Sequence, residues 1–190
     1  MGKWYVEADW AVEIGAGLER IDADWSGLVD LRTEPQRVGE ITEAAGRPAL
    51  RETLLDLNAA ASPVFTSRCD VWKLEGEIDP LEFEASPETS AGGMACYLDV
   101  LSRDAALFAS FERHEAWVRL AVLTLRQVER HQGRVDLVVR AAEYRGEAGF
   151  GITLYAAGCG RDTRAAEAAW GAALRAAAAA TMRVARSVGE

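Results

Sequence analysis

The segment Gly158-Cys159-Gly160-Arg161 is the local feature most suggestive of chemistry. It follows an apolar, strand-like run and precedes an alanine-rich helical pattern. Glycines ahead of a helix N-terminus expose backbone N–H groups and favour anion binding. A thiol placed there beside an arginine would be stabilised as a thiolate and could react. The alternative is a tight turn from strand to helix, in which Cys159 points inward and Asp162 caps the helix.

Charged residues also interrupt segments that otherwise have the β-branched composition of strands. An arginine on a sheet either lies on an open face or pairs with a carboxylate. Convergence of such residues on one face would give a polar cleft suited to a small molecule. The candidate binding residues on the strands are Arg68, Asp70 and Arg140. An enzyme using this cleft would add Asp99 and Tyr155.

Several kinds of catalytic and metal site have no support in the sequence. The chain has no glycine-rich nucleotide loop, no nucleophile elbow and no CxxC pair. His114 and His131 lie 17 residues apart on one predicted helix, about 26 Å along its axis, so they cannot share a metal. The charged neighbours of His114, including Glu112 and Glu115, favour a solvated helix face over a general base. We predict no metal and no cofactor, and we favour a protein without catalysis.

The cysteines fit a reduced, buried role. The chain has three cysteines, an odd number at wide spacings: Cys69, Cys96 and Cys159. This pattern predicts neither a disulfide framework nor a zinc ribbon. Free cysteine behaves as a small apolar residue and is commonly buried, so we interpret Cys69 and Cys96 as core. The alternative is a pocket in which these thiols meet Asp70 and Asp99.

Hydrophobic periodicity predicts the elements that must position these residues. Alternation over Trp4–Ile14 predicts a strand with one wet face, and a second, short strand is predicted over Ser26–Arg32. Thr33-Glu34-Pro35-Gln36 fits a capping box and predicts a helix that reaches Ala45. A further helix is predicted around Leu50–Leu57.

The rest of the chain continues in the same alternation of strand pairs and helices. An acidic stretch, at about residues 75–93, predicts a long surface connection. Residues 117–125 are β-branched enough to form a strand in isolation, although the longer pattern favours helix. The predicted elements are strands at Val64–Leu74 and Ala95–Leu101, a helix from Ser102 or Asp104 to about His131, a hairpin of Val135–Tyr144 and Phe150–Ala156, and a final helix from Asp162 or Thr163 to about Ser187.

The resulting order, ββα-ββα-ββα, predicts one α+β domain over residues 1–190. We expect a largely antiparallel sheet with helices packed on one face. From the second strand onward the order β-α-β-β-α-β matches a ferredoxin-like core, with an extra N-terminal strand and a C-terminal strand and helix. The first strand has no free neighbour in that strand order, which leaves its pairing open.

Charge excludes two classes of partner. The net charge is −9, but residues 103–190 carry 13 Arg and Lys against 10 Asp and Glu, whereas residues 1–102 carry 8 against 20. An acidic front half disfavours nucleic acid and an anionic membrane surface.

The absence of an apolar signal region predicts a cytoplasmic protein. We expect a module that binds a small molecule, a basic protein or a second copy in a homodimer. The alternatives are a small-molecule enzyme and an acidic neutralising partner protein.

Overall fold

A mixed sheet with helices on one face forms the framework of the molecule. The computed structural model describes residues 19–74, 79, 83, 92–128 and 133–188, together with the backbone of residues 5–11 and of Gly189. The strands run in the order β1-β5-β6-β4-β3, and β2 also pairs with β5. The strands are β1 (Tyr5–Ala11), β2 (Ile21–Asp22), β3 (Val64–Leu74), β4 (Gly92–Ser102), β5 (Gly133–Tyr144) and β6 (Glu147–Gly160).

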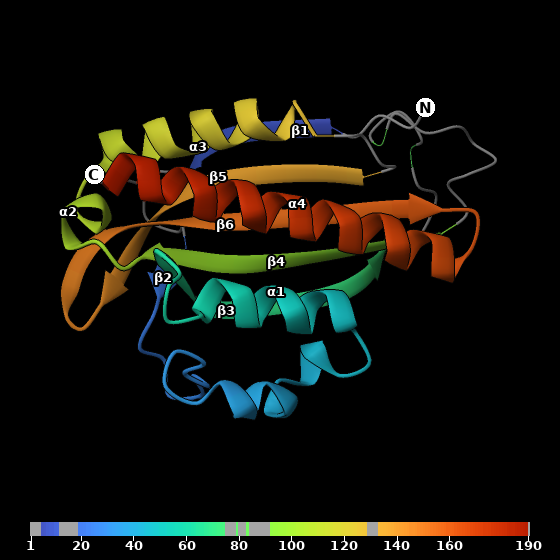
Figure 1. Ribbon diagram of the computed structural model, residues 1–190, viewed down its shortest axis with the longest axis horizontal. Helices are drawn as coiled ribbons and strands as arrows, with labels where there is room; N and C mark the ends of the chain where they lie inside the picture. The colour runs from blue at the N-terminus through green and yellow to red at the C-terminus, as the bar shows by residue number, and fades with distance from the viewer. Residues whose placement is uncertain are drawn as a thin grey trace.

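The helices are of two kinds. Two short 3₁₀ helices, η1 (Pro35–Glu40) and η2 (Thr42–Ala44), precede the first α-helix. The α-helices are α1 (Pro48–Asn58), α2 (Ala105–Phe108), α3 (Phe111–Leu125) and α4 (Thr163–Gly189). Residues 117–125 are therefore helical. In Figure 1 the three longer helices, α1, α3 and α4, lie on the near face of the sheet.

The α+β class is confirmed, but the strand arrangement differs from the prediction. The pairings β3–β4, β4–β6 and β5–β6 are antiparallel, whereas β1 and β2 both run parallel to β5. The sheet is therefore mixed, and the prediction of a largely antiparallel sheet is wrong. The reason is that β1 does not form a hairpin with β2, the next strand in the sequence. It pairs instead with the edge of β5 that is not bonded to β6.

The ferredoxin-like strand order is not confirmed either. It required a strand at Ser26–Arg32, where the structure has turns and extended backbone, and the short strand present is β2. Trp25 and Leu28 close one of these turns, because the Leu28 amide donates to the Trp25 carbonyl. The position beside β4 that such a strand would fill is taken by β6.

The predicted capping box does not form. Thr33 donates its hydroxyl to the Asp30 carbonyl at 3.2 Å instead of capping a helix, and Glu34 precedes η1 without a side-chain cap. The segment therefore begins without its predicted cap, and two 3₁₀ helices replace the predicted α-helix.

The long helix predicted from Ser102 or Asp104 is divided. Asp104 caps α2, and four residues later the chain bends so that Ser110 caps α3 by accepting from the Arg113 amide at 3.2 Å. Serine competes with the helix interior for such a hydrogen bond. The predicted helix end at about His131 is wrong, because α3 ends at Leu125 and residues 126–128 form a turn. Most of the predicted acidic connection at about 75–93 lies outside the described residues.

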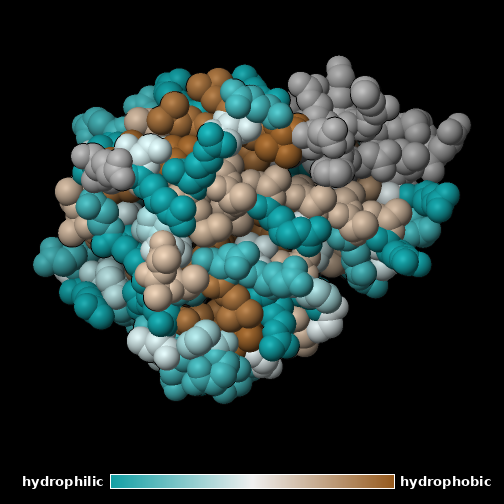
Figure 2. Space-filling view, viewed as in Figure 1, coloured by the Kyte–Doolittle hydropathy of each residue, from teal (hydrophilic) through white to brown (hydrophobic). Residues whose placement is uncertain are grey.

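The main core lies between the sheet and the helix layer. Leu98, Leu137 and Leu154 point from the three central strands toward Trp117 and Trp170, and all are buried. Trp117 also donates its indole N–H to the Thr181 carbonyl at 2.9 Å, which ties α3 to α4. In Figure 2 the alanine-rich α4 forms a pale band across the middle, and darker apolar areas lie over α3. None of the described helices is both long and apolar enough to cross a membrane.

The face of the sheet opposite the helices is concave. Phe65 on β3 and Tyr144 on β5 have ring centroids 5.0 Å apart, although β4 and β6 lie between their strands. The sheet must therefore curl at this end, as strongly twisted sheets do. A small second core fills the curl and consists of Ile21, Ala23, Phe65, Leu101, Phe108 and Ala142.

Candidate ligand-binding site

A β-bulge in β3 shapes the middle of the concave face. Thr66 pairs with Val100 and Cys69 with Leu98, so β3 holds one extra residue between these pairs. A bulge bends its strand and redirects a side chain. Here it brings Arg68 to a pocket that Asp99 of β4 also lines.

Five polar side chains converge beside this bulge in a pocket of about 160 Å³, which we call the polar pocket. They come from four adjacent strands of the sheet, so the framework that holds them is rigid. Arg20 and Glu19, from the segment before β2, add charge at its rim. The convergent residues are Arg68 on β3, Asp99 on β4, Arg140 on β5, and Thr153 and Tyr155 on β6.

Asp99 is the buried acid of the polar pocket. It is only 7% exposed, and its Oδ1 accepts a hydrogen bond from the Thr153 hydroxyl at 2.6 Å. Burial raises the pKa of the Asp99 carboxyl, and the hydrogen bond from Thr153 and the charges of Arg140 and Arg68 offset only part of that rise. The site thus holds a carboxyl group with an increased tendency to keep its proton.

Arg140 supplies the pocket's buried donor. Its Nη2 donates to the Tyr155 hydroxyl at 2.9 Å, which orients the guanidinium. Its Nε is buried and has no hydrogen-bond partner among the residues that the structure describes. A buried donor without an acceptor costs about 1–3 kcal/mol. An acceptor on a bound molecule would remove that cost.

A second hollow of about 600 Å³, the apolar pocket, shares Arg68 and Tyr97 with the polar pocket. The Trp25 indole forms part of its wall and is fixed by a 3.0 Å hydrogen bond to the Ser67 carbonyl. Arg68 lies 5.3 Å above the Trp25 ring, a cation–π distance. The other apolar lining residues are Val29, Leu31, Ile41 and Leu54. The lining also includes the acidic side chains of Glu40, Glu43 and Asp70, so the two pockets together provide a partly apolar volume with a polar end.

Three aromatic rings cross the concave face beside the polar pocket. Tyr97 lies 6.5 Å from Trp72 on β3 and 6.1 Å from Tyr155 on β6, measured between ring centroids. Their interplanar angles, 49° and 51°, are those of tilted aromatic contacts. Burial raises the pKa of the Tyr97 phenol, so it remains a hydrogen-bond donor at neutral pH.

The structure brings together part of the predicted site. Arg68, Asp99, Arg140 and Tyr155 all line the polar pocket, and Asp70 lines the adjoining apolar pocket. The sequence reasoning did not include Tyr97 and Thr153, which complete the polar pocket. Both alternate with apolar residues in their strands, and that alternation is the signal that could have found them.

Gly158, Cys159, Gly160 and Arg161 line none of the pockets described here. A Cβ at Gly158 would overlap the Trp170 backbone nitrogen, and one at Gly160 would crowd the Ala166 nitrogen. Cys159 is fully buried, burial raises the pKa of its thiol, and the Arg161 side chain is 80% exposed. Gly158, Cys159 and Gly160 end β6, so the predicted glycine turn does not form at these residues. As the alternative expected, Cys159 is buried and Asp162 caps α4 by accepting from the Ala165 amide at 2.8 Å, which leaves no reactive thiolate here.

His114 and the other two cysteines also belong to the packing of the chain. His114 is fully buried against Trp117 and Phe150, so the predicted solvated helix face is wrong at this residue, and burial lowers the pKa of its imidazole. Burial raises the pKa of Cys69 and of Cys96 to about 12. Within the described residues, no cluster of three or more His, Cys, Asp or Glu side chains could hold a metal ion.

The chain matches no family model, no curated protein and no solved structure. The function must therefore be argued from the site's own geometry.

Proposed function

We propose that this chain is a small-molecule-binding domain that holds an amphipathic ligand on its concave face. The observation that carries the proposal is that Arg140, which lines the same small pocket as Asp99, keeps a buried Nε–H without a hydrogen-bond partner among the described residues. Buried polar groups are normally hydrogen-bonded, and an exception calls for an explanation. A ligand acceptor at this point supplies one.

The two pockets define the chemistry of the ligand. The polar pocket takes a compact head that accepts a hydrogen bond from Arg140, such as a carboxylate or a carboxamide. The apolar pocket takes a ring or short hydrocarbon, because Trp25 and Leu54 line it. Apolar pockets with a few convergent polar groups are the usual form of small-molecule sites.

Three compounds with one indole body test this chemistry: indole-3-acetate, indole-3-acetamide and tryptamine. Saturation-transfer NMR should detect the acetate and the acetamide, whose heads offer acceptors, and should give a weaker response for tryptamine. Arg140→Met should abolish the response, whereas Arg161→Met, at an exposed arginine, should leave it unchanged. Equal binding to the Arg140→Met variant would overturn the proposal.

A second candidate function is an enzyme that uses Asp99 as a general acid or base. The observation that favours it is the combination of a raised pKa with convergent Arg and Tyr side chains in one pocket, since perturbed acids concentrate at catalytic sites. Thr153 and Arg140 would then orient Asp99 and the substrate.

Prolonged incubation separates the two functions. Indole-3-acetate or indole-3-acetamide is incubated with the protein for days and followed by NMR. If the spectrum of the compound does not change, the result favours binding without catalysis for this ligand class. Conversion that is lost in Asp99→Asn, while binding persists, would establish catalysis at this carboxyl.

A further inference from the structure

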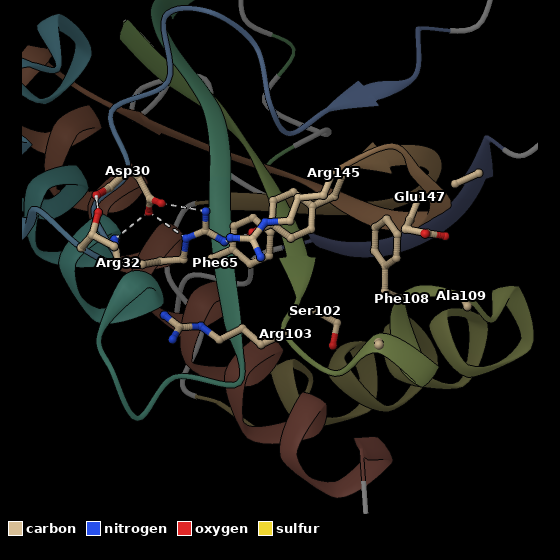
Figure 3. A pocket seen from close by; sticks show the side chains of 13 residues that line it. Asp30, Arg32, Phe65, Ser102, Arg103, Phe108, Ala109, Arg145 and Glu147 are labelled. Carbon is tan, nitrogen blue, oxygen red and sulfur yellow. Dashed lines mark hydrogen bonds and ion pairs between the residues drawn. The ribbon is translucent and has the colours of Figure 1, made fainter.

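A separate pocket of about 570 Å³, the arginine pocket, opens at the curled end of the sheet (Figure 3). It shares no lining residue with the polar or the apolar pocket. Four segments distant in sequence build it: residues 30–33, Phe65 of β3, residues 102–109 and the β5–β6 turn. It is therefore a product of the tertiary fold.

Arg32 forms one wall of this pocket in a fixed orientation. Its Nε and Nη2 donate to the two oxygens of Asp30 at 2.7 and 2.8 Å, and its Nη1 donates to the Tyr144 hydroxyl at 2.8 Å. The guanidinium also lies 4.1 Å from the centroid of the Phe65 ring. The carboxylate of Asp30 is thus already occupied, and the pKa of Asp30 is lowered by this hydrogen bonding.

Arg103 adds a second positive charge with no carboxylate bound to it in the described part of the chain. Its Nε donates to the Val64 carbonyl, and its Nη2 donates to the carbonyls of Asn58 and Ala59. Burial and, next, the charge of Arg32 lower the pKa of Arg103. The positive charge of Arg103 therefore adds to that of Arg32 at this pocket, and the combined charge would favour a nearby anion.

Arg145 adds a third positive charge from a strained position. It occupies the turn between β5 and β6 with φ 54°, and Gly146 follows with φ 77°. A positive φ is uncommon for a residue other than glycine, asparagine or aspartate, and strained residues concentrate at functional sites. The Asp24 carboxylate accepts from the Arg145 amide and anchors the turn. The Arg145 guanidinium lies 5.1 Å from the Tyr144 ring and has no ion pair among the described residues.

Aromatic and small apolar residues make up much of the remaining lining of the arginine pocket. Phe65, Phe108 and Tyr144 contribute rings, with Phe65 lying against the Arg32 guanidinium, and Ala105 and Ala148 are small. Glu147 adds one carboxylate to the lining. Figure 3 shows Phe65 and Phe108 on either side of the cavity, with Arg145 reaching in from the hairpin turn. A ligand here would need both an anionic group and an apolar ring.

We propose that the arginine pocket binds a phosphate monoester carried on an aromatic body. Arg145 contacts the anion, Arg32 and Arg103 provide the surrounding positive field, and Phe108 and Tyr144 pack against the ring. Guanidinium groups bind phosphate and carboxylate through paired N–H donors. This site acts independently of the ligand site on the concave face.

Isothermal titration with phenyl phosphate, inorganic phosphate and benzyl alcohol tests the proposal. We expect phenyl phosphate to bind with an affinity that falls as salt is added, inorganic phosphate to bind at least tenfold more weakly, and benzyl alcohol not to bind. Equal binding of inorganic phosphate and phenyl phosphate would overturn the aromatic part of the proposal. Absence of binding by every anion would overturn all of it.

The decisive variant is Arg145→Asn, because it creates Asn before Gly146, the preferred pair for a two-residue turn with positive φ. Its melting temperature should equal or exceed that of the wild type, so a loss of binding cannot reflect unfolding. We expect the affinity for phenyl phosphate to fall at least tenfold. Arg161→Asn, at an exposed arginine, should retain wild-type affinity. Full binding by Arg145→Asn would contradict the proposal.

Discussion

Phe65 and Tyr144 touch across the concave face, with ring centroids 5.0 Å apart, from strands that two others separate. This contact closes the curled end of the sheet and supports the arginine pocket. It also joins residues 79 positions apart in the sequence, so it couples the middle of the chain to its final hairpin.

Phe65→Ala should therefore destabilise the whole fold. Phe65 is 2% exposed, and truncation of a buried phenylalanine costs about 3–5 kcal/mol. Urea denaturation should show this loss in the free energy of unfolding. Trp72→Ala, on the same strand but with 38% of its side chain exposed, serves as the control and should cost less. A similar loss for both variants would contradict the proposed importance of the curl.

Asp99→Asn should change the dependence of stability on pH. Burial raises the pKa of Asp99 in the folded chain, so the folded state holds this proton more tightly than the unfolded state. Its contribution to the free energy of unfolding falls as pH rises from about 3.9 through the raised pKa. The asparagine variant should lack this fall and be more stable than wild type at neutral pH. Denaturation at several pH values from 4 to 8 gives the free energy of unfolding of each protein. If this free energy changes with pH in the same way for both proteins, the raised pKa of Asp99 is refuted.

His114 should produce the opposite trend. Burial lowers the pKa of its imidazole in the folded chain, so the unfolded state binds a proton first. Stability is then lost as pH falls from about 6.5 toward the lowered pKa. His114→Leu should flatten this part of the curve whatever its effect on absolute stability. An unchanged slope between pH 5 and 7 would show that His114 does not titrate there.

Gly158→Ala should be severely destabilising, because the new Cβ overlaps the backbone of Trp170 in α4. Overpacking of a filled core costs about 1–3 kcal/mol and sometimes more, and here the obstacle is backbone that cannot rotate away. Gly39→Ala, where no atom lies within 4 Å of the new Cβ, is the matched control and should change stability by less than about 0.5 kcal/mol. Thermal denaturation compares the two variants directly.

The three cysteines should resist thiol reagents in the native state. Cys96 and Cys159 are fully buried, and burial raises the pKa of Cys69 to about 12. Ellman's reagent at pH 8 should react slowly with the native protein and release three equivalents in urea. Rapid native reaction of one thiol that disappears in Cys159→Ala would restore the hypothesis of a reactive thiolate before α4.

The sequence predicted those elements whose pattern is local. Val64–Leu74 forms β3 as expected, and the apolar seam that begins near Trp170 lies on α4. The 3₁₀ segment and the break at Ser110 were missed because competing side-chain hydrogen bonds, from Thr33 and to Ser110, decided the local structure. The parallel pairing of β1 with β5 could not be predicted, because the composition of a strand does not determine which strand it pairs with.

The residues of the candidate site could likewise be predicted only where their signal is local in the sequence. Arg68 and Arg140 stand out as charges within strands, so their place on the open face could be predicted. The bulge that brings Arg68 beside Asp99 could not, because it depends on the register between β3 and β4. Arg32 and Arg145 lie in connections, where charged residues are ordinary, and only the tertiary fold brings them to one cavity.

The pairing of β1 also sets an order of events during synthesis. Tyr5 pairs with Arg134 and Ala11 with Arg140, partners 129 residues further along the chain. At roughly 5–20 residues per second, the N-terminal strand is made on the order of ten seconds before its partner exists. A nascent chain therefore carries an unpaired strand through most of its translation, and the sheet can close at this edge only after the final hairpin has left the ribosome.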